Sequence, residues 1–187
     1  MRSTVAGTLF IVLSSAVSAR ATVLRPMDLA ELVAESSVIV HGRVVDVRPE
    51  WVRGGRQIDS VVTVEVEAAF LGSPGRRVSF ATPGGQIGEY RSIVPGAPEF
   101  ARGDEVVLFL DSGRDRAYPA VLGLSQGALP VSLDAERRKR VRIPLLVPGL
   151  AEAHLPVRVS VTLEELGEQL ARVRAAAQRR TGAGGAR

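Results

Sequence analysis

At 187 residues the chain is long enough for one domain with its own core, and 45% apolar, 24% charged and 4% aromatic residues are typical of a globular protein poor in aromatic side chains. It has no cysteine, which excludes disulfides, cysteine metal sites, a thiol nucleophile and a lipid-modified N-terminal cysteine. The formal net charge is +4, and Lys139 is the only lysine among 24 basic residues. We attribute this excess of arginine first to a coding bias of the genome and only second to phosphate binding.

Residues 1–21 have the organisation of a secretory signal peptide. Arg2 precedes the apolar run Val5–Val17, and Ala19-Arg20-Ala21 fits the small-x-small pattern that a signal peptidase accepts. The run is too short to span a hydrocarbon layer of about 30 Å as a helix. We therefore expect cleavage after Ala21 and a secreted or periplasmic protein whose net charge falls to +2, because Arg2 and Arg20 are lost. That small charge counts against a nucleic-acid partner.

Residues 22–132 predict a β-barrel domain that begins with a short helix. Asp28 and Glu31 fit a capping box for a helix over Met27–Glu35. In the strand that follows, Ser37–Arg48, the apolar residues change face near Gly42, which indicates a β-bulge. A first strand that bends in this way is typical of a small closed barrel.

The longest predicted strand, Asp59–Gly72, has one apolar and one polar face. Arg76–Thr82 predicts a third strand, and Glu105–Leu110 is apolar on both faces, as expected of a strand covered on both sides. Two further β segments complete the domain, Ala117–Leu124 and Ala128–Val131. The prediction is a mainly β fold: a small OB-like antiparallel barrel of five to six strands.

The composition changes after this domain. Residues 133–161 are basic and rich in proline, and we expect an irregular crossing there. Thr162 and Glu165 fit a second capping box, which opens an amphipathic helix over 162–180. The glycine-rich residues 181–187 predict a disordered tail.

Two loops are the candidate binding surface, because loops at the rim of a barrel carry recognition in such folds. They are Glu50–Arg56 and Gly84–Pro98 with its flank, and the candidate residues are Trp51, Arg53, Gly84, Gly85, Gln86 and Glu99. For Trp51 two interpretations stay open, a cap on one end of the barrel or an exposed binding anchor. The pair Gly84-Gly85 favours a turn with positive φ over a phosphate loop, because no Lys-Ser/Thr follows and no helix begins there.

The only run of like charge comprises Arg137, Arg138, Lys139, Arg140 and Arg142. It indicates a solvated loop or edge strand, and the alternative is an anionic polymer or membrane surface as partner. No aromatic residue is interleaved, so the run offers no platform for stacked bases.

The sequence predicts no catalytic or metal site and no cofactor. His41 and His154 are the only histidines, and His41 shares a strand face with Ile39 and Arg43 that points outward or beneath a helix. Two separate histidines are too few for a zinc site, and no serine-hydrolase or zinc-protease motif is present. A hydrolase is the least favoured alternative.

The segments Ser-Ser-Val-Ile-Val-His-Gly-Arg-Val-Val, Ala-Phe-Leu-Gly, Gly-Asp-Glu-Val-Val-Leu-Phe-Leu and Gly-Leu-Ser-Gln-Gly resemble a group of uncharacterised exported bacterial β-barrel proteins. More distantly, Leu24–Val131 is similar to the netrin-like OB-type domain of the tissue inhibitors of metalloproteases. In those inhibitors an N-terminal cysteine chelates the protease zinc, and this chain has none. The resemblance therefore implies an OB-type barrel with flanking helices, and it does not imply that inhibitory mechanism. From the lack of a catalytic constellation and from the rim loops, we expect an exported non-catalytic binding module whose partner is another exported protein or an envelope component.

Overall fold

In the residues described by the computed structural model (25–113, 117–145 and 157–183), the chain forms two helices and ten strands. The elements are α1 (Leu29–Glu35), β1 (Val38–Val52), β2 (Gln57–Leu71), β3 (Arg77–Pro83), β4 (Gly85–Ile87), β5 (Tyr90–Ser92), β6 (Glu105–Asp111), β7 (Ala120–Val121), β8 (Ala128–Leu133), β9 (Lys139–Leu145), β10 (Val157–Thr162) and α2 (Leu163–Ala183). The predicted signal peptide and His154 lie outside the described residues.

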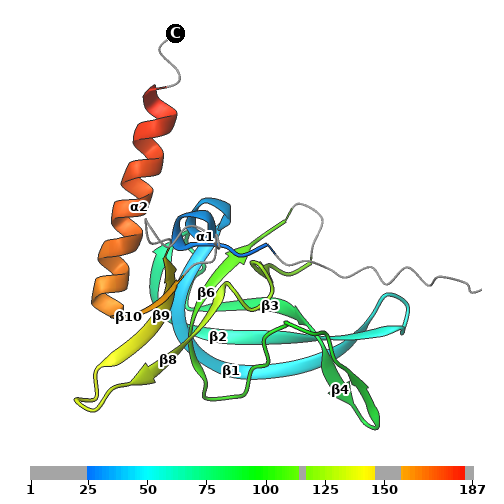
Figure 1. Ribbon diagram of the computed structural model, residues 1–187. Helices are drawn as coiled ribbons and strands as arrows, with labels where there is room; N and C mark the ends of the chain where they lie inside the picture. The colour runs from blue at the N-terminus through cyan, green and yellow to red at the C-terminus, as the bar shows by residue number, and fades with distance from the viewer. Residues whose placement is uncertain (1–24, 114–116, 146–156, 184–187) are drawn as a thin grey trace, which may run out of the picture.

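Five strands close into a barrel. Their order is β1-β2-β3-β7-β6, and β6 pairs with β1 to complete the circle (Figure 1). The pairs are antiparallel except for β3–β7, which is parallel through Ala81 and Ala120. The predicted fold class, a small mainly β barrel with a short helix before it and a long helix after it, is confirmed.

The first strand bends as predicted. Its register against β2 shifts at three places, including His41/Gly42 and Val44/Asp46, so that β1 pairs with β2 over its whole length and with β6 at its start. A Cβ at Gly42 would lie 2.3 Å from the Glu65 carbonyl oxygen, so only glycine allows the two backbones this approach. The barrel closes at this bend.

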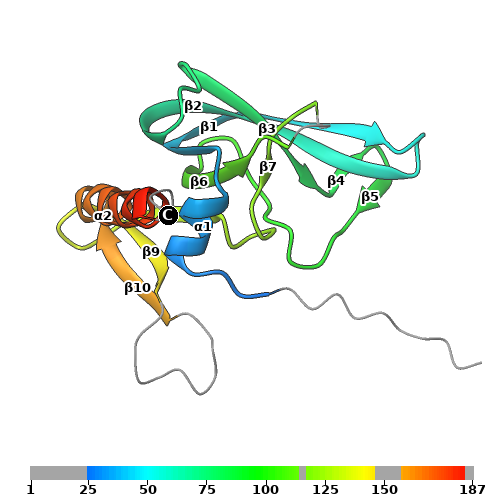
Figure 2. The ribbon, with the colours of Figure 1, turned by 90° about the horizontal axis from the view of Figure 1, so that it is seen from above.

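Strand β6 separates two apolar cores. Val106, Leu108 and Leu110 face the barrel interior, where they pack with the apolar side of β2 and with Phe80. Val107 and Phe109 face the opposite way, into a second core built by α1, β9 and α2 (Figure 2). The prediction that this strand is covered on both sides is confirmed, and one cover includes the terminal helix.

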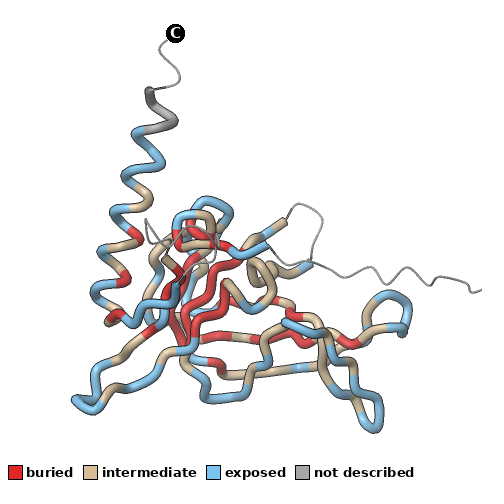
Figure 3. The backbone as a smooth tube through the Cα atoms, in the orientation of Figure 1, coloured by how far each residue is buried: buried red, intermediate tan, exposed pale blue. Residues whose placement is uncertain are grey.

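The terminal helix packs by its first half only. Leu166 and Leu170 are buried, whereas the residues from Ala175 to Arg179 are exposed and the helix extends away from the barrel (Figure 3). Its capping box is present, because Thr162 N donates to Glu165 and Glu165 N donates to Thr162. Among the described residues, neither helix combines the length and the apolar character that a membrane crossing requires.

Two sequence predictions are wrong after residue 133. The segment 133–161 is not an irregular crossing where it is described, because β9 and β10 form an antiparallel pair that extends the sheet from β8. Pro144 is compatible with β9 because the ladder between β8 and β9 ends at Val141, so no bond to β8 is lost at the proline. The helix also continues to Ala183, through residues 181–183 that were assigned to the tail.

Candidate functional site

The hairpin β4–β5 is a separate two-stranded sheet that stands against one end of β2 (Figure 1). Two glycines make its entry possible: Gly84 has φ 102° and Gly85 has φ 152°. A Cβ at Gly85 would lie 2.7 Å from Ser60 Oγ. Ser60 Oγ donates to the Gly84 carbonyl oxygen (2.8 Å) and Gly84 N donates to the Ile58 carbonyl oxygen (3.0 Å). The predicted positive-φ turn thus holds the hairpin on β2.

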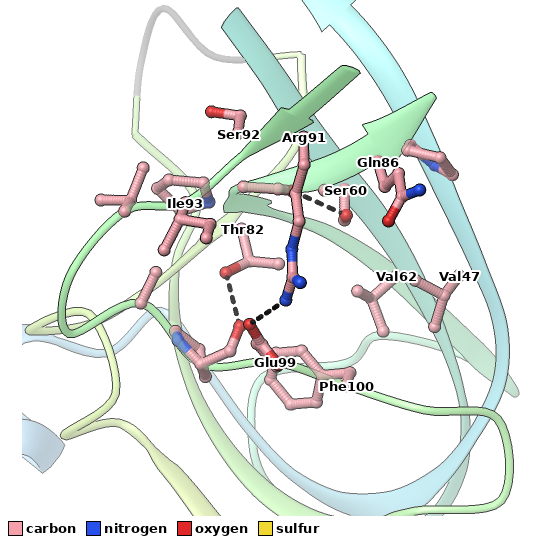
Figure 4. Close-up of a pocket in the computed structure, with 17 residues that line it drawn as sticks. Val47, Ser60, Val62, Thr82, Gln86, Arg91, Ser92, Ile93, Glu99 and Phe100 are labelled. Carbon is pink, nitrogen blue, oxygen red and sulfur yellow. Dashed lines mark hydrogen bonds and ion pairs between the residues drawn. The ribbon is translucent and has the colours of Figure 1, made fainter. Parts of the chain in front are cut away.

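Between this hairpin and the segment 93–100 lies a pocket of about 430 Å³, here called the rim pocket (Figure 4). Its lining residues are Val47, Pro49, Ser60, Val62, Thr82, Pro83, Gly84, Gly85, Gln86, Arg91, Ser92, Ile93, Val94, Ala97, Pro98, Glu99 and Phe100. Val62 belongs to the buried core of the barrel, and Val47 and Phe100 are partly buried and pack against that core. The rim pocket is therefore an opening of the barrel whose floor is apolar.

Charged groups lie across the rim pocket. Arg91 extends from β5 toward Glu99, and their charged ends are 3.7 Å apart (Figure 4). Both side chains are exposed, and an exposed ion pair contributes only about 0–1 kcal/mol. A ligand that carries its own charge can replace either partner at little cost.

The segment 93–100 is fixed in place. Thr82 Oγ1 donates to the Pro98 carbonyl oxygen (3.3 Å), and Ser125 N donates to the Gly96 carbonyl oxygen (3.1 Å). The Phe100 ring packs edge-on against the buried Phe80, with centroids 5.2 Å apart. The rim pocket is thus largely preformed, as small binding sites usually are.

Large exposed apolar side chains gather beside the rim pocket. Trp51 is 44% exposed, and Tyr90 and Ile93 are each 68% exposed. Trp51 and Tyr90 contact each other edge-to-face, with ring centroids 5.6 Å apart and planes at 67°. In the described part of the chain the other exposed large apolar residues are Leu133, Val157 and Val159, which lie on β8 and β10. Aromatic side chains in such a position are typical of binding surfaces.

A polar cluster lies on the outer face of the barrel, where Lys139 at the start of β9 reaches it. His41 is buried, its Nε2 is 2.6 Å from Glu105 Oε1, and its Nδ1 is 3.8 Å from Glu67 Oε2. Lys139 Nζ lies 2.6 Å from Glu105 Oε1 and 3.0 Å from Glu67 Oε2. Arg43 completes the cluster with a bond of 2.9 Å to Glu105 Oε2.

The electrostatics of this cluster are those of a neutralised ion network. Burial raises the pKa of Glu105, but hydrogen bonds from Lys139 and His41 outweigh it, so the pKa lies below its ordinary value. Hydrogen bonds to Glu105 and then Glu67 raise the pKa of Lys139. Ligand atoms of His41, Glu67 and Glu105 lie within 4.8 Å of one another and resemble a cation site. Lys139 and Arg43 already bind these carboxylates, so ion pairs tie the four strands together at this cluster.

The structure brings together most of the residues predicted for binding. Gly84, Gly85, Gln86 and Glu99 line the rim pocket, and Trp51 lies at its edge, half exposed and outside both cores. Arg53 does not join them, since it lies in the turn between β1 and β2 and is not among the lining residues. The same loops contain Arg91, which the sequence analysis did not single out.

The basic run does not form one patch. Arg138 pairs with Asp134 and Glu136, Lys139 belongs to the ion network, and Arg140 donates to the Ser160 carbonyl oxygen. Of the five residues, only Arg137 and Arg142 are exposed and make no ion pair or side-chain hydrogen bond with the described part of the chain. The basic residues therefore stabilise the β8–β9 turn and the neighbouring strands.

His41 faces out of the barrel as predicted, and it is buried. The sequence pattern did place the two acidic partners of His41. Glu67 lies on the polar face of β2, and Glu105 is the first residue of β6 and pairs with Arg43 of β1. That Lys139 of β9 would contact these carboxylates could not be read from the strand pattern.

Comparisons with protein-family models, curated proteins and solved structures found no match for this chain.

Proposed function

We propose that this protein is an exported, non-catalytic binding module that holds an extended segment of another exported protein in the rim pocket. The observation that carries the proposal is a preformed cavity that combines an apolar floor with an exchangeable Arg91–Glu99 pair. The exposed aromatic pair Trp51–Tyr90 lies beside this cavity and does not line it. Apolar pockets with a few convergent polar groups are the usual form of a binding site.

The non-catalytic part of the proposal draws support from the hydroxyl groups in the pocket. Ser60 and Thr82 both donate to backbone carbonyl oxygens, so neither is held by a general base. No histidine is among the residues that line the rim pocket in the described ranges. His41, elsewhere, is hydrogen-bonded to Glu105 through Nε2.

We further propose an OB-type barrel related to the netrin-like domain. The support is the closed strand order, with a parallel bridge between the third and fifth barrel strands. OB folds bind their ligands on the face of strands 2 and 3 and the adjoining loops. Ser60 and Val62 of β2 and Thr82 of β3 line the rim pocket, so the proposed site uses the same two strands. The proposal that the protein is exported rests on the signal-peptide pattern of residues 1–21.

The alternative partner, an anionic polymer or a membrane surface held by Arg137–Arg142, has less support. Three of the five basic residues bind acceptors within the chain. A surface that depends on phosphate contacts needs its cations free to release counterions.

The proposal is tested with the mature protein, residues 22–187, against a phage-displayed library of random linear 12-residue peptides. Ala97→Trp fills the rim pocket, and Ala34→Trp places the same ring on the exposed side of α1 as a control. We expect peptides that bind the wild type and the control, with affinity lowered at least tenfold by Ala97→Trp. The proposal is wrong if no peptide is enriched, if only oligosaccharides from a glycan array bind, or if both variants bind alike.

A further inference from the structure

A second cavity lies on the other side of the segment that walls the rim pocket. Its volume is about 500 Å³, and it shares Pro98, Glu99 and Phe100 with the rim pocket. We call it the side pocket. The remaining lining residues come from β6, β8 and their neighbours: Asp104, Glu105, Val106, Ser125, Ala128, Pro130, Val131 and Arg158. One short stretch of chain thus separates two cavities of similar size.

We call residues 98–100, which line both cavities, the wall. We propose that the bound segment crosses this wall, with an apolar side chain in the rim pocket and a lysine or arginine side chain in the side pocket. The inference rests on the proposed function and adds the ligand's chemistry. The side chains of an extended polypeptide point alternately in opposite directions, so one bound peptide can place two of its side chains in two separate cavities. A fatty acyl chain would instead need one continuous apolar cavity.

The lining of the side pocket favours a basic residue. Val106, Ala128 and Val131 supply apolar surface for an aliphatic stem, and Glu99 and Asp104 are exposed carboxylates at the wall. Glu105 also lines the pocket, but it is already bound by Arg43 and Lys139. Arg158 is the one cation of the lining, against the carboxylates of Asp104 and Glu99, and Glu99 is paired with Arg91 from the other pocket. A cationic head can therefore bind Asp104 and share Glu99 with Arg91 across an exposed ion pair that is easily exchanged.

The wall gives the spacing of the two anchors. It is one chain segment with its side chains, and chain layers that pack through side chains lie about 10 Å apart, so we take the crossing as about 10 Å. An extended peptide advances about 3.3 Å per residue, which places the basic residue two to four positions from the apolar one. The wall itself is fixed by Thr82, Phe80 and Ser125, so the spacing is set by the fold.

The test uses the peptides enriched on the wild-type mature protein and measures their affinities by isothermal titration calorimetry. Ser125→Trp fills the side pocket from an exposed position, with Ala34→Trp as the matched control. Asp104→Asn removes one carboxylate, with Glu164→Gln on the exposed first turn of α2 as the charge control. Circular dichroism melting checks that each variant is folded.

We expect enriched peptides to carry an apolar residue and a lysine or arginine two to four positions away. Ser125→Trp should weaken them about tenfold and Asp104→Asn about threefold, with both controls unchanged. Replacing the basic residue of the peptide by alanine should abolish the effect of both substitutions. If peptides bind through the rim pocket but carry no such basic residue, or bind Ser125→Trp like the control, the inference is wrong and the proposed function stands. If no peptide is enriched, both are wrong.

Discussion

Lys139 Nζ lies 2.6 Å from Glu105 Oε1, and this contact joins β9 to the barrel strand β6. The same ammonium contacts Glu67 on β2, and Glu105 contacts His41 on β1. Four strands from distant parts of the sequence thus meet in one ion network. The network ties β9, which contributes Val141 and Ile143 to the second core, to the barrel.

Loss of this ammonium should destabilise the fold. In Lys139→Met the carboxylates of Glu67 and Glu105 lose their shared cation, and removing one partner of a partly buried network typically costs about 1–3 kcal/mol. Arg138→Met is the matched control, because Arg138 is a neighbouring exposed cation whose pairs contribute about 1 kcal/mol or less. Urea unfolding measures both, and equal losses in the two variants would contradict this role of Lys139.

The network also predicts the acid sensitivity of the protein. The pKa of Glu105 is lower in the folded protein than its ordinary value, so its contribution to stability is present above about pH 4.3 and is lost as the pH falls through the lowered pKa. Glu31 and Glu165, whose pKa values are lowered by backbone hydrogen bonds at Asp28 and Thr162, act in the same direction.

In urea unfolding between pH 7 and pH 3, the wild type should therefore lose stability more steeply than Glu105→Gln, and the two should converge at the acid end. Glu136→Gln, in the exposed β8–β9 turn, is the control and should keep the wild-type slope. A constant difference between wild type and Glu105→Gln at every pH would contradict the assignment.

Two glycine-to-alanine substitutions should have opposite signs. At Gly42 the new Cβ would lie 2.3 Å from the Glu65 carbonyl oxygen and 2.6 Å from Val64 Cγ1, so we expect Gly42→Ala to cost about 2 kcal/mol or more. At Gly167 the nearest atom is Phe70 Cε1 at 3.5 Å, an ordinary contact within a helix, and alanine should stabilise by about 0.5–1 kcal/mol. Thermal unfolding measures the stability of both variants. A Gly42→Ala protein as stable as the wild type would show that the bulge tolerates a side chain.

Trp51 is the only tryptophan, so its fluorescence reports on the edge of the rim pocket. Tyr90→Ala removes the ring that packs against it and should make Trp51 more accessible to iodide, with a red-shifted emission maximum. Tyr118→Ala, at the other tyrosine of the chain, should leave both unchanged. Identical quenching of all three proteins would show that Tyr90 does not shield Trp51 in solution.

Local patterns were sufficient to predict much of the barrel. The alternation in β2, the change of face near Gly42 and the two capping boxes each depend on neighbouring residues, and all are present. The strands β9 and β10 were missed because Pro144 and the basic run resemble loop composition, and only the register with β8 makes a strand possible there.

The candidate site was predictable in part for the same reason. Gly84 and Gly85 marked the turn that builds the rim pocket, because their conformation is a local property. Arg91 was missed because an arginine on a short exposed strand has no local signal, and its position opposite Glu99 follows from how the segment 93–100 folds back. The side pocket depends on β8 and β10 and could not be read from any one segment.

The most direct test of the binding role is photo-crosslinking in the exported compartment of the native host. Benzoylphenylalanine replaces Ile93 at the edge of the rim pocket, and in a matched protein it replaces Leu133, which is similarly exposed on β8. We predict one discrete polypeptide adduct at position 93 that Ala97→Trp abolishes, with none at position 133. No adduct at position 93, or the same adducts at both positions, would contradict the account.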